Sequence, residues 1–369
     1  MLRTLIIGGR EIGINALGQP MDRAFDRLHA AYFGNAPFPW EDFTAAALQY
    51  FDTNAGAPTA HDAYFSTFTV IWQSIIDSGR LDNAEHIWKR ALEPAQQWEQ
   101  AHPGQPIHKG TPYYFWATTA LLRGDLDRGY LLMHQGFEED IRTSGQQTPD
   151  TPGYAFVSLN DKKVEQAFRQ WVVEQVAFFS DLITNYAATY QRAFTFEDAK
   201  RRFIDTPPSV DTVFLLTYTI ARLRKIAELP GHITSNAFAG QLQLNLLFDV
   251  TLVIDTAIKN KNQAQWQFID HAERLLVAAG HQLTNQHLRD ISAQFKSNFD
   301  AALQSALDGT LTVQPSATLD RLQCDVALAY GLRNRGAHNL TTAVTVRNRF
   351  HAVQGALFRV LCATIDYLY

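Results

Sequence analysis

The chain contains the stretch Ser78-Gly-Arg-Leu-Asp-Asn-Ala84, which returns 45 positions later as Arg123-Gly-Asp-Leu-Asp-Arg-Gly129. An apolar, aromatic segment precedes each copy, and a second apolar segment follows it, both with helical spacing. Gly79 and Gly124 stand where the first helix of each pair should end, because glycine adopts the left-handed conformation without strain. The repeat therefore predicts two consecutive helical hairpins within residues 62–143.

Each copy also carries an aspartate, Asp82 or Asp127, that we expect at the start of the second helix of its pair. A carboxylate there can cap free backbone N–H groups. The shared pattern resembles tetratricopeptide-type repeats, although its spacing is longer than the usual ~34 residues. The resemblance implies a surface for a protein partner or regulator in the N-terminal part of the chain.

Helical periodicity dominates the rest of the sequence, and the only predicted strand is Leu2–Ile7. A loop rich in Gly, Thr and Pro covers residues 143–153, and Pro207-Pro208 interrupts the chain again. Helices are expected at residues 163–190 and 211–229. From about residue 237 a further helix is expected that holds Leu242 to Ile254, followed by helices at 263–279, 286–307, 317–334 and 342–368. In the last of these, apolar residues form a nearly heptad stripe, which is typical of one face of a bundle helix.

We therefore expect an all-α protein, built from helical-hairpin repeats and a C-terminal helical bundle. At 369 residues the chain is long for one domain, so two or three modules are expected. The predicted divisions are an N-terminal repeat module at 1–155, a helical middle segment at 156–235 and a bundle at 236–369.

Composition limits the classes of function that suit the chain. Its net charge is −5 and its pI is near 6.2, whereas a protein that coats nucleic acid along its whole surface is usually basic. Two isolated cysteines, Cys324 and Cys362, favour a reduced cytoplasmic protein over a disulfide framework. No apolar run reaches about 18 residues, and the N-terminal run is too short for a signal peptide, so no membrane association is expected.

The segment between the last two predicted helices carries the clearest chemical motif. It reads Leu328-Ala-Tyr-Gly-Leu-Arg333-Asn334-Arg-Gly-Ala-His338-Asn-Leu340. This order of residues resembles the motif of HEPN-domain ribonucleases. In that motif an Arg is followed by a polar residue, often Asn, then by a few further residues and a His, near the end of a small helical bundle. Arg followed by His at a similar spacing occurs four more times in the chain, each time without Asn after the Arg, and the near-repeat Arg347-Asn-Arg-Phe-His351 is one residue too short.

The resemblance implies a metal-independent endoribonuclease that acts on single-stranded RNA without a cofactor. Arg333, Asn334 and His338 would be its catalytic residues. Histidine suits proton transfer near neutral pH, and arginine is a permanent forked donor to phosphate. Attack by the RNA 2′-OH would leave 2′,3′-cyclic phosphate ends. In HEPN enzymes two motifs meet across a two-fold axis, so the resemblance implies a homodimer with one composite site, and a role as a regulated toxin or antiviral effector.

Local charge supports contact with a polyanion, because arginines outnumber acidic residues in the last fifty positions. We expect Arg335, Arg347 and Arg349 to bind the RNA backbone. Acidic residues support the motif in many HEPN domains, and the candidates here are Asp249 and Asp255, although a solvated helix face explains them equally well.

Other interpretations remain open. An alternative explanation of Arg333 and His338 is that basic side chains interact favourably with the dipole at the C-terminus of a helix. The chain could then be a non-catalytic adaptor that dimerises through an inert bundle, or a subunit that needs a second protein for activity. The pair His102 and His108 is expected in a surface turn rather than at a metal, and the aromatic run 113–116 is expected mainly to pack between repeats.

Overall fold

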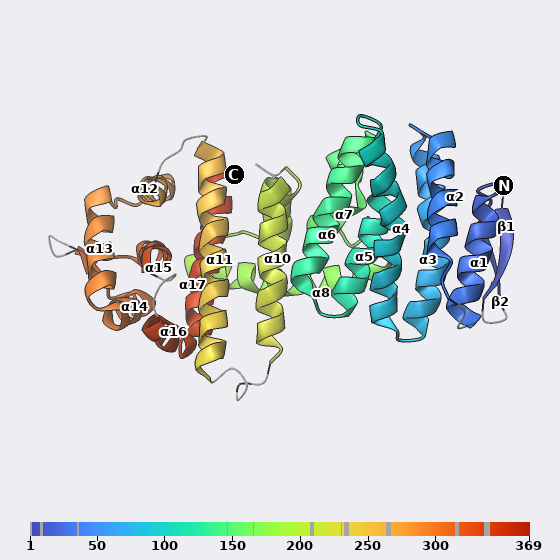
Figure 1. Cartoon of the computed structure of the whole chain (residues 1–369). Helices are drawn as coiled ribbons and strands as arrows, with labels where there is room; N and C mark the ends of the chain where they lie inside the picture. Colours follow the sequence, from blue (N-terminus) through green and yellow to red (C-terminus); the bar gives the residue numbers. More distant parts are fainter. Residues whose placement is uncertain are drawn as a thin grey trace. The chain divides into compact units, whose positions relative to one another are not determined.

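Figure 1 shows the chain as a computed structural model, in which nearly all regular structure is helical. The predicted all-α class is therefore confirmed. The chain divides into two compact units, which are described separately: unit 1 is Met1–Phe156 with Lys163–Phe168, and unit 2 is Val157–Lys162 with Arg169–Tyr369. The residues described are 2–7, 10–34, 37–145, 147–164, 166–206, 210–229, 231, 236–262, 267–313, 317–335 and 340–369.

The first boundary between the two units lies between Phe156 and Val157, and all residues from Arg169 onward belong to unit 2.

Unit 1 begins with a β-hairpin, whose first strand is the predicted one, and continues with helices that pair in sequence order. Its elements are β1 (Leu2–Ile7), β2 (Arg10–Asn15), α1 (Met21–Gly34), α2 (Trp40–Thr53), α3 (Pro58–Asp77), α4 (Leu81–Ala101), α5 (Gly110–Leu122), α6 (Leu126–Glu139), a π-helical turn (Asp140–Ser144), a 3₁₀ turn (Thr148–Asp150) and α7 (Pro152–Val157).

The two copies of the repeat form the turns between α3 and α4 and between α5 and α6. Gly79 and Gly124 have φ angles of +72° and +79°, so both take the left-handed conformation that the sequence predicts. Asp82 and Asp127 lie in the first turn of α4 and α6, at the helix starts as predicted, but neither is the N-cap residue. Asp125 caps α6, accepting the N–H of Arg128 at 3.1 Å, and the equivalent position in α4 is Arg80, which makes no side-chain cap.

Aromatic side chains make up much of the core of unit 1. Phe25, Phe43 and Phe68 meet edge to face, with ring centroids 4.8–5.5 Å apart. Trp88 of α4 stacks on Phe115 of α5 at 5.5 Å, which joins the two helical hairpins. Such pairs contribute about 0.5–1.5 kcal/mol each beyond their burial, so they fix how neighbouring helices pack.

Unit 2 contains the long helix α8, which begins in unit 1, and the whole C-terminal bundle. Its elements are α8 (Gln166–Tyr190), α9 (Phe196–Ala199), a π-helical turn (Lys200–Ile204), α10 (Val210–Ala227), α11 (Ala237–Asn262), α12 (Phe268–Ala278), α13 (Asn285–Ser297), α14 (Phe299–Asp308), β3 (Thr312–Val313), β4 (Ala317–Thr318), α15 (Arg321–Arg335), α16 (Leu340–Arg347) and α17 (Phe350–Leu368).

Two predicted helices of the bundle are divided in the structure. The helix expected at 286–307 breaks at Asn298, whose side chain accepts the N–H of Ala301 at 3.2 Å and so caps α14. The helix expected at 342–368 breaks at Arg349, between α16 and α17. The helix expected from residue 317 begins only at Arg321, because Ala317–Thr318 pairs with Thr312–Val313 as a two-stranded sheet.

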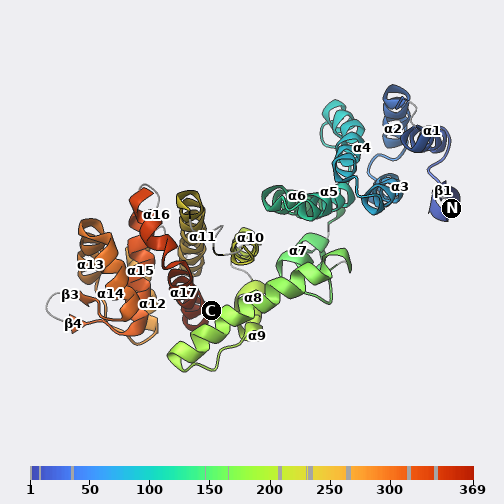
Figure 2. The same cartoon turned by 90° about the horizontal axis from the view of Figure 1, so that it is seen from below.

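Helix α17 lies at the centre of unit 2. It packs against α11, α12 and α15, as Figure 2 shows, and Phe179 of α8 contacts its Phe358. The predicted apolar stripe is buried from Phe350 to Thr364, and from Ala356 to Ile365 the other faces of the helix are buried as well. Polar side chains in this part of the helix therefore need partners.

The main polar partner inside this bundle is Asp325 of α15. Arg359 of α17 donates to both of its carboxylate oxygens, at 2.7 and 2.8 Å, and both residues are buried. Tyr190 of α8 also donates to Asp325, and burial, together with this carboxylate, raises the pKa of Tyr190. The bidentate pair fixes the register of α15 against α17, and therefore the position of the motif at the end of α15.

Candidate active site

The motif begins at the C-terminal end of α15. Arg333 and Asn334 lie in its last turn, and Arg335 is its final residue. Asn334 is exposed, whereas the Arg333 side chain keeps only 28% of its surface exposed. His338 lies outside the described residues. Two of the three predicted catalytic residues are thus placed, side by side at one helix end.

Asp255 of α11 holds Arg333 in place. The guanidinium Nη2 donates to Oδ2 of this carboxylate at 2.7 Å, and Asp255 is only 4% exposed. Lys259, one turn further along α11, donates to the same oxygen at 2.8 Å. Two cations therefore compensate a carboxylate whose desolvation would otherwise be costly.

The pair leaves polar atoms without a partner among the described residues. Oδ1 of Asp255 and Nε of Arg333 are both buried and make no hydrogen bond there. A buried polar atom left unpaired costs about 1–3 kcal/mol. Nε of Arg90 and Nε of Arg224 are unpaired in the same way, and these arginines also form ion pairs, so the two atoms of the motif do not by themselves mark a ligand site.

Apolar contacts set the position of this arginine as well. The Arg333 guanidinium lies 5.5 Å from the ring centre of Phe268 in α12, and Phe268 stacks in parallel on Tyr330, one turn before Arg333. Gly331 lets α15 approach α13, because a Cβ at this position would come within 2.5 Å of the Phe295 ring. Packing on two sides thus fixes the turn that carries the motif.

The three arginines expected to bind RNA are in different situations. Arg335 ends α15, but its side chain lies outside the described part of the structure. Arg347, in the last turn of α16, is partly buried. Arg349 donates to Gln304 at 2.8 Å and lies 3.4 Å from Asp300. Asp249, the other acidic candidate, pairs with Arg222 at 2.7 Å.

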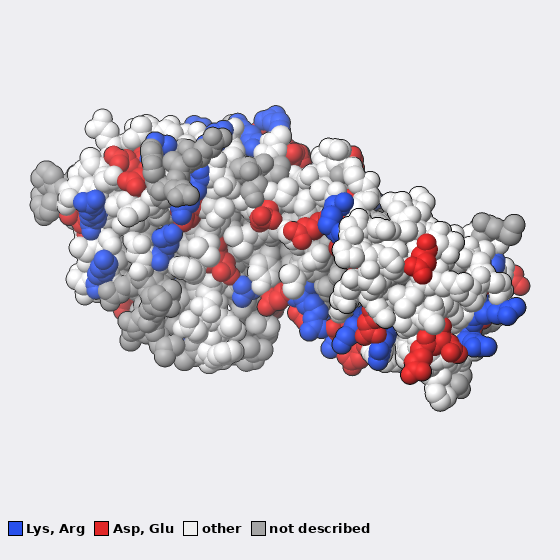
Figure 3. Space-filling model, turned by 45° about the horizontal axis from the view of Figure 1, so that its top comes forward, with Lys and Arg blue, Asp and Glu red and all other residues white. Residues whose placement is uncertain are grey.

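Intramolecular pairs compensate part of the positive charge of the C-terminal segment. Arg359 is neutralised by Asp325, and Arg321 lies 3.4 Å from the same carboxylate. Asp366 is taken by Arg192 and Arg202, which come from outside the segment. On the face of unit 2 that Figure 3 shows, basic side chains lie apart, with uncharged atoms between them. Charge counted along the sequence therefore overstates the basic surface.

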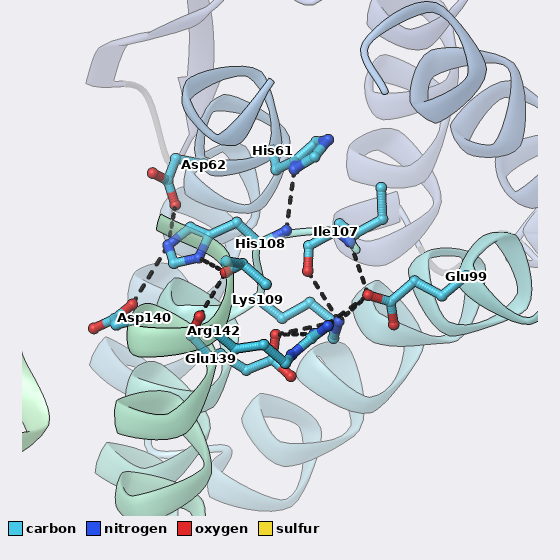
Figure 4. Close-up of polar contacts among 10 residues, drawn as sticks. His61, Asp62, Glu99, Ile107, His108, Lys109, Glu139, Asp140 and Arg142 are labelled. Atoms are coloured by element: carbon cyan, nitrogen blue, oxygen red, sulfur yellow. Dashed lines mark hydrogen bonds and ion pairs between the residues drawn. The ribbon is translucent and has the colours of Figure 1, made fainter. Parts of the chain in front are cut away.

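A second polar cluster, which the sequence did not predict, lies inside unit 1 (Figure 4). Its centre is the segment before α5, where Ile107, His108 and Lys109 are all buried. The amine of Lys109 donates to Glu99 at 2.6 Å and lies 3.3 Å from Glu139, and Arg142 joins the same two carboxylates. The expected surface turn at 102–108 is thus exposed only at its beginning.

The histidines of this cluster have defined roles. His61 accepts the backbone N–H of His108 at Nδ1, so its proton is on Nε2 and is donated to the carbonyl of Asn54. His108 donates from Nδ1 to Thr143, whose own hydroxyl proton goes to the Glu139 carbonyl. Its Nε2 faces Asp140 at 3.4 Å and Asp62 at 3.5 Å.

Burial shifts the pKa of two members of the cluster. Desolvation lowers the pKa of His61 below its ordinary value of 6.5. It also raises the pKa of Asp140, although hydrogen bonding from Tyr114 opposes the change. The cluster joins α3, α4, α5 and the turn after α6, so we interpret it as the polar core of unit 1. In the sequence, the indication that His108 and Lys109 are buried was the apolar residue Ile107 directly before them.

Two general features concern metals and membranes. Among the described residues, no three His, Cys, Asp or Glu side chains are grouped so that they could hold a metal ion. One helical stretch, Phe238–Lys261, is long and apolar enough to cross a membrane, but 61% of its most apolar part is buried inside unit 2.

No protein-family model, curated protein or solved structure matches this chain.

Proposed function

We propose that this chain is a metal-independent endoribonuclease of the HEPN type, acting on single-stranded RNA. The observation that carries the proposal is the ion pair between Arg333 and Asp255, 78 residues apart, at the end of the motif helix. A cation at a helix end needs no buried carboxylate if it serves only the helix dipole. A buried carboxylate that orients it is what a preorganised phosphate donor requires.

The chemistry requires three actions at one phosphodiester. The 2′-OH loses its proton and attacks phosphorus, a new O2′–P bond forms, and the P–O5′ bond breaks as the leaving oxygen receives a proton. His338 is the group whose ordinary pKa suits both proton transfers. Arg333 and Asn334 donate to the phosphate oxygens, on which negative charge increases. The products are a 2′,3′-cyclic phosphate and a 5′-OH.

One chain supplies one arginine and one histidine, whereas the reaction needs a base, an acid and charge stabilisation. We therefore propose that two copies bring their motifs together in one site, and that Arg335, Arg347 and Arg349 add contacts to RNA. The hairpins of unit 1, as tetratricopeptide-like repeats, would bind a protein partner or regulator. A cytoplasmic toxin or antiviral effector that is kept under control fits this arrangement.

One observation favours the alternative, an adaptor whose bundle is inert. Arg349 and Arg359 are occupied by acidic partners within the chain, which lowers the charge available to RNA. In that case the hairpins of unit 1 would carry the function.

Cleavage of a labelled single-stranded RNA in EDTA tests the proposal. Wild type should cleave, whereas Arg333→Ala and His338→Ala should lose at least about 100-fold in rate, the usual effect of removing an acid–base or electrostatic group. His351→Ala, which removes an exposed histidine near the start of α17, is the matched control and should cleave like wild type. Equal rates for all four proteins would exclude the proposed site, and the adaptor predicts no cleavage by any of them.

A further inference from the structure

The first strand of unit 1 has an open edge. β1 and β2 form a two-stranded sheet, and no other described strand pairs with either. β2 lies toward the body of the unit, since Asn15 at its end donates to Ser66 of α3 at 3.0 Å. β1 is the other strand of the hairpin, and among the described residues only β2 pairs with it. Open edges of this kind are templates for pairing with another strand.

The register of the hairpin shows which backbone groups face outward. Ile7 is paired with Arg10 across a two-residue connection, so it belongs to a hydrogen-bonded pair, as do Leu5 and Arg3 further along the strand. The N–H and C=O groups of the residues between them, Leu2, Thr4 and Ile6, therefore point to the open edge.

The side chains of the same three residues are also free of the body of unit 1. Leu2 and Ile6 are 72% and 62% exposed, and Thr4 is exposed between them. Arg3, on the other face, is held at 3.0 Å by Asp22 and at 2.5 Å by Asp26 of α1. The edge therefore presents two large apolar side chains, while its one charge is compensated by α1.

We propose that β1 pairs with β1 of a second copy of this chain, antiparallel about a two-fold axis at Thr4. The sequence around Thr4 is self-complementary in this register, because Leu2 of one copy lies opposite Ile6 of the other and each Thr4 lies opposite its equivalent. Every outward N–H and C=O of the three residues gains a partner, and the apolar side chains pair across the new contact. In a two-fold contact both copies contribute the same surface, and the residues of β1 can pair with the same strand of a second copy in this way.

Cysteine cross-linking tests the register directly. Thr4→Cys places two thiols opposite each other at a Cα separation of about 5.5 Å, which suits a disulfide. The native Cys324 and Cys362 are buried and do not compete. Glu11→Cys, an exposed position on β2 of the same hairpin, is the matched control. We expect linked dimers of Thr4→Cys to form at least roughly tenfold faster than those of Glu11→Cys, because pairing raises the effective thiol concentration.

Equal rates for the two cysteine variants would overturn the proposal. A dimer formed through unit 2 does not reproduce the expected difference, because it gives no reason for Thr4 to meet its equivalent. Opposite charges at position 4, on the proposed two-fold axis, provide a second test. Thr4→Lys and Thr4→Glu should each abolish pairing of β1, and an equimolar mixture should restore it as a heterodimer. A mixture that associates no better than either variant alone would also contradict the self-paired strand.

Discussion

Arg333 and Asp255 are joined by a 2.7 Å ion pair that connects the end of α15 to the middle of α11. The acidic partner is buried and the basic one is partly exposed, so the charge that can reach a ligand is the positive one. The same contact places the motif on a rigid part of unit 2, where packing and ion pairs act together.

We expect Asp255→Asn to destabilise unit 2 by about 1–3 kcal/mol, because it leaves two cations beside a neutral group; a fully buried pair would lose more. Urea unfolding measures the loss. Asp249→Asn, on the same helix, is the control: Asp249 keeps 24% of its side chain exposed, against 6% for Asp255, so loss of its pair with Arg222 should cost less, about 1 kcal/mol. Equal losses would mean that the Arg333 contact has no special role.

Gly331→Ala should lower the free energy of unfolding by about 1–3 kcal/mol, because its Cβ would meet the Phe295 ring at 2.5 Å. Gly355→Ala, in α17, makes only an ordinary 3.5 Å contact and should be neutral or stabilising by up to about 1 kcal/mol. Thermal melts of the two variants measure this difference in stability. If both alanines were tolerated alike, α13 and α15 would not pack as closely as described.

Removal of the buried carboxylate at the centre of unit 2 should have a larger effect. Asp325→Ala leaves Arg359 buried without its partner, and we expect a loss of about 3–5 kcal/mol. Asp300→Ala removes an exposed partner of Arg349 and should change stability by no more than about 1 kcal/mol. Denaturant unfolding compares the two, and a small effect of Asp325→Ala would contradict the central position of this pair.

The stability of unit 1 should depend on pH through His61. Its folded pKa is lowered by burial, so below about pH 6.5 the unfolded chain binds more protons than the folded one, and acidification favours unfolding. Melting temperatures at pH 7.5 and 5.5 measure this loss. His61→Phe should be less stable at both values, because Asn54 and His108 lose a hydrogen-bond partner, but the fall between them should be smaller.

Asp140 provides a contrast of opposite sign. Its raised folded pKa means that the folded state binds the proton more readily, so this group favours folding as the pH falls from its folded pKa toward 3.8. Asp140→Asn should remove that gain at acid pH. A variant with the same pH profile as wild type would show that the Asp140 carboxyl is not perturbed by burial.

The sequence predicted secondary structure well where a local pattern of residues determines it. The left-handed glycines at 79 and 124, and the helices α8 and α10, follow from turn chemistry and helical spacing. The break at Asn298 was missed because apolar periodicity continues across it, while the capping side chain acts within a single turn. The short strand at Ala317–Thr318 depends on a partner strand, which periodicity does not detect.

The candidate site was predicted only in part. The Asn after the Arg and the setting between the last two helices made Arg333 and Asn334 candidates, and their role stays a prediction. Asp255 was no more than one of two acidic candidates, because a contact between residues 78 positions apart leaves no local pattern. The cluster around His108 was missed for the same reason, since its carboxylates come from three separate elements. Net charge along the C-terminal segment does not show which arginines are paired in space, as Arg349 and Arg359 are.

The most direct test of the central claim compares a single-stranded RNA with a 2′-deoxy oligonucleotide of the same sequence, each incubated with the homogeneous protein in EDTA. The account predicts that wild type cleaves the RNA alone and leaves 2′,3′-cyclic phosphate and 5′-OH ends, and that Arg333→Ala abolishes the reaction. Cleavage of the 2′-deoxy strand, or unchanged cleavage of RNA by Arg333→Ala, would contradict it.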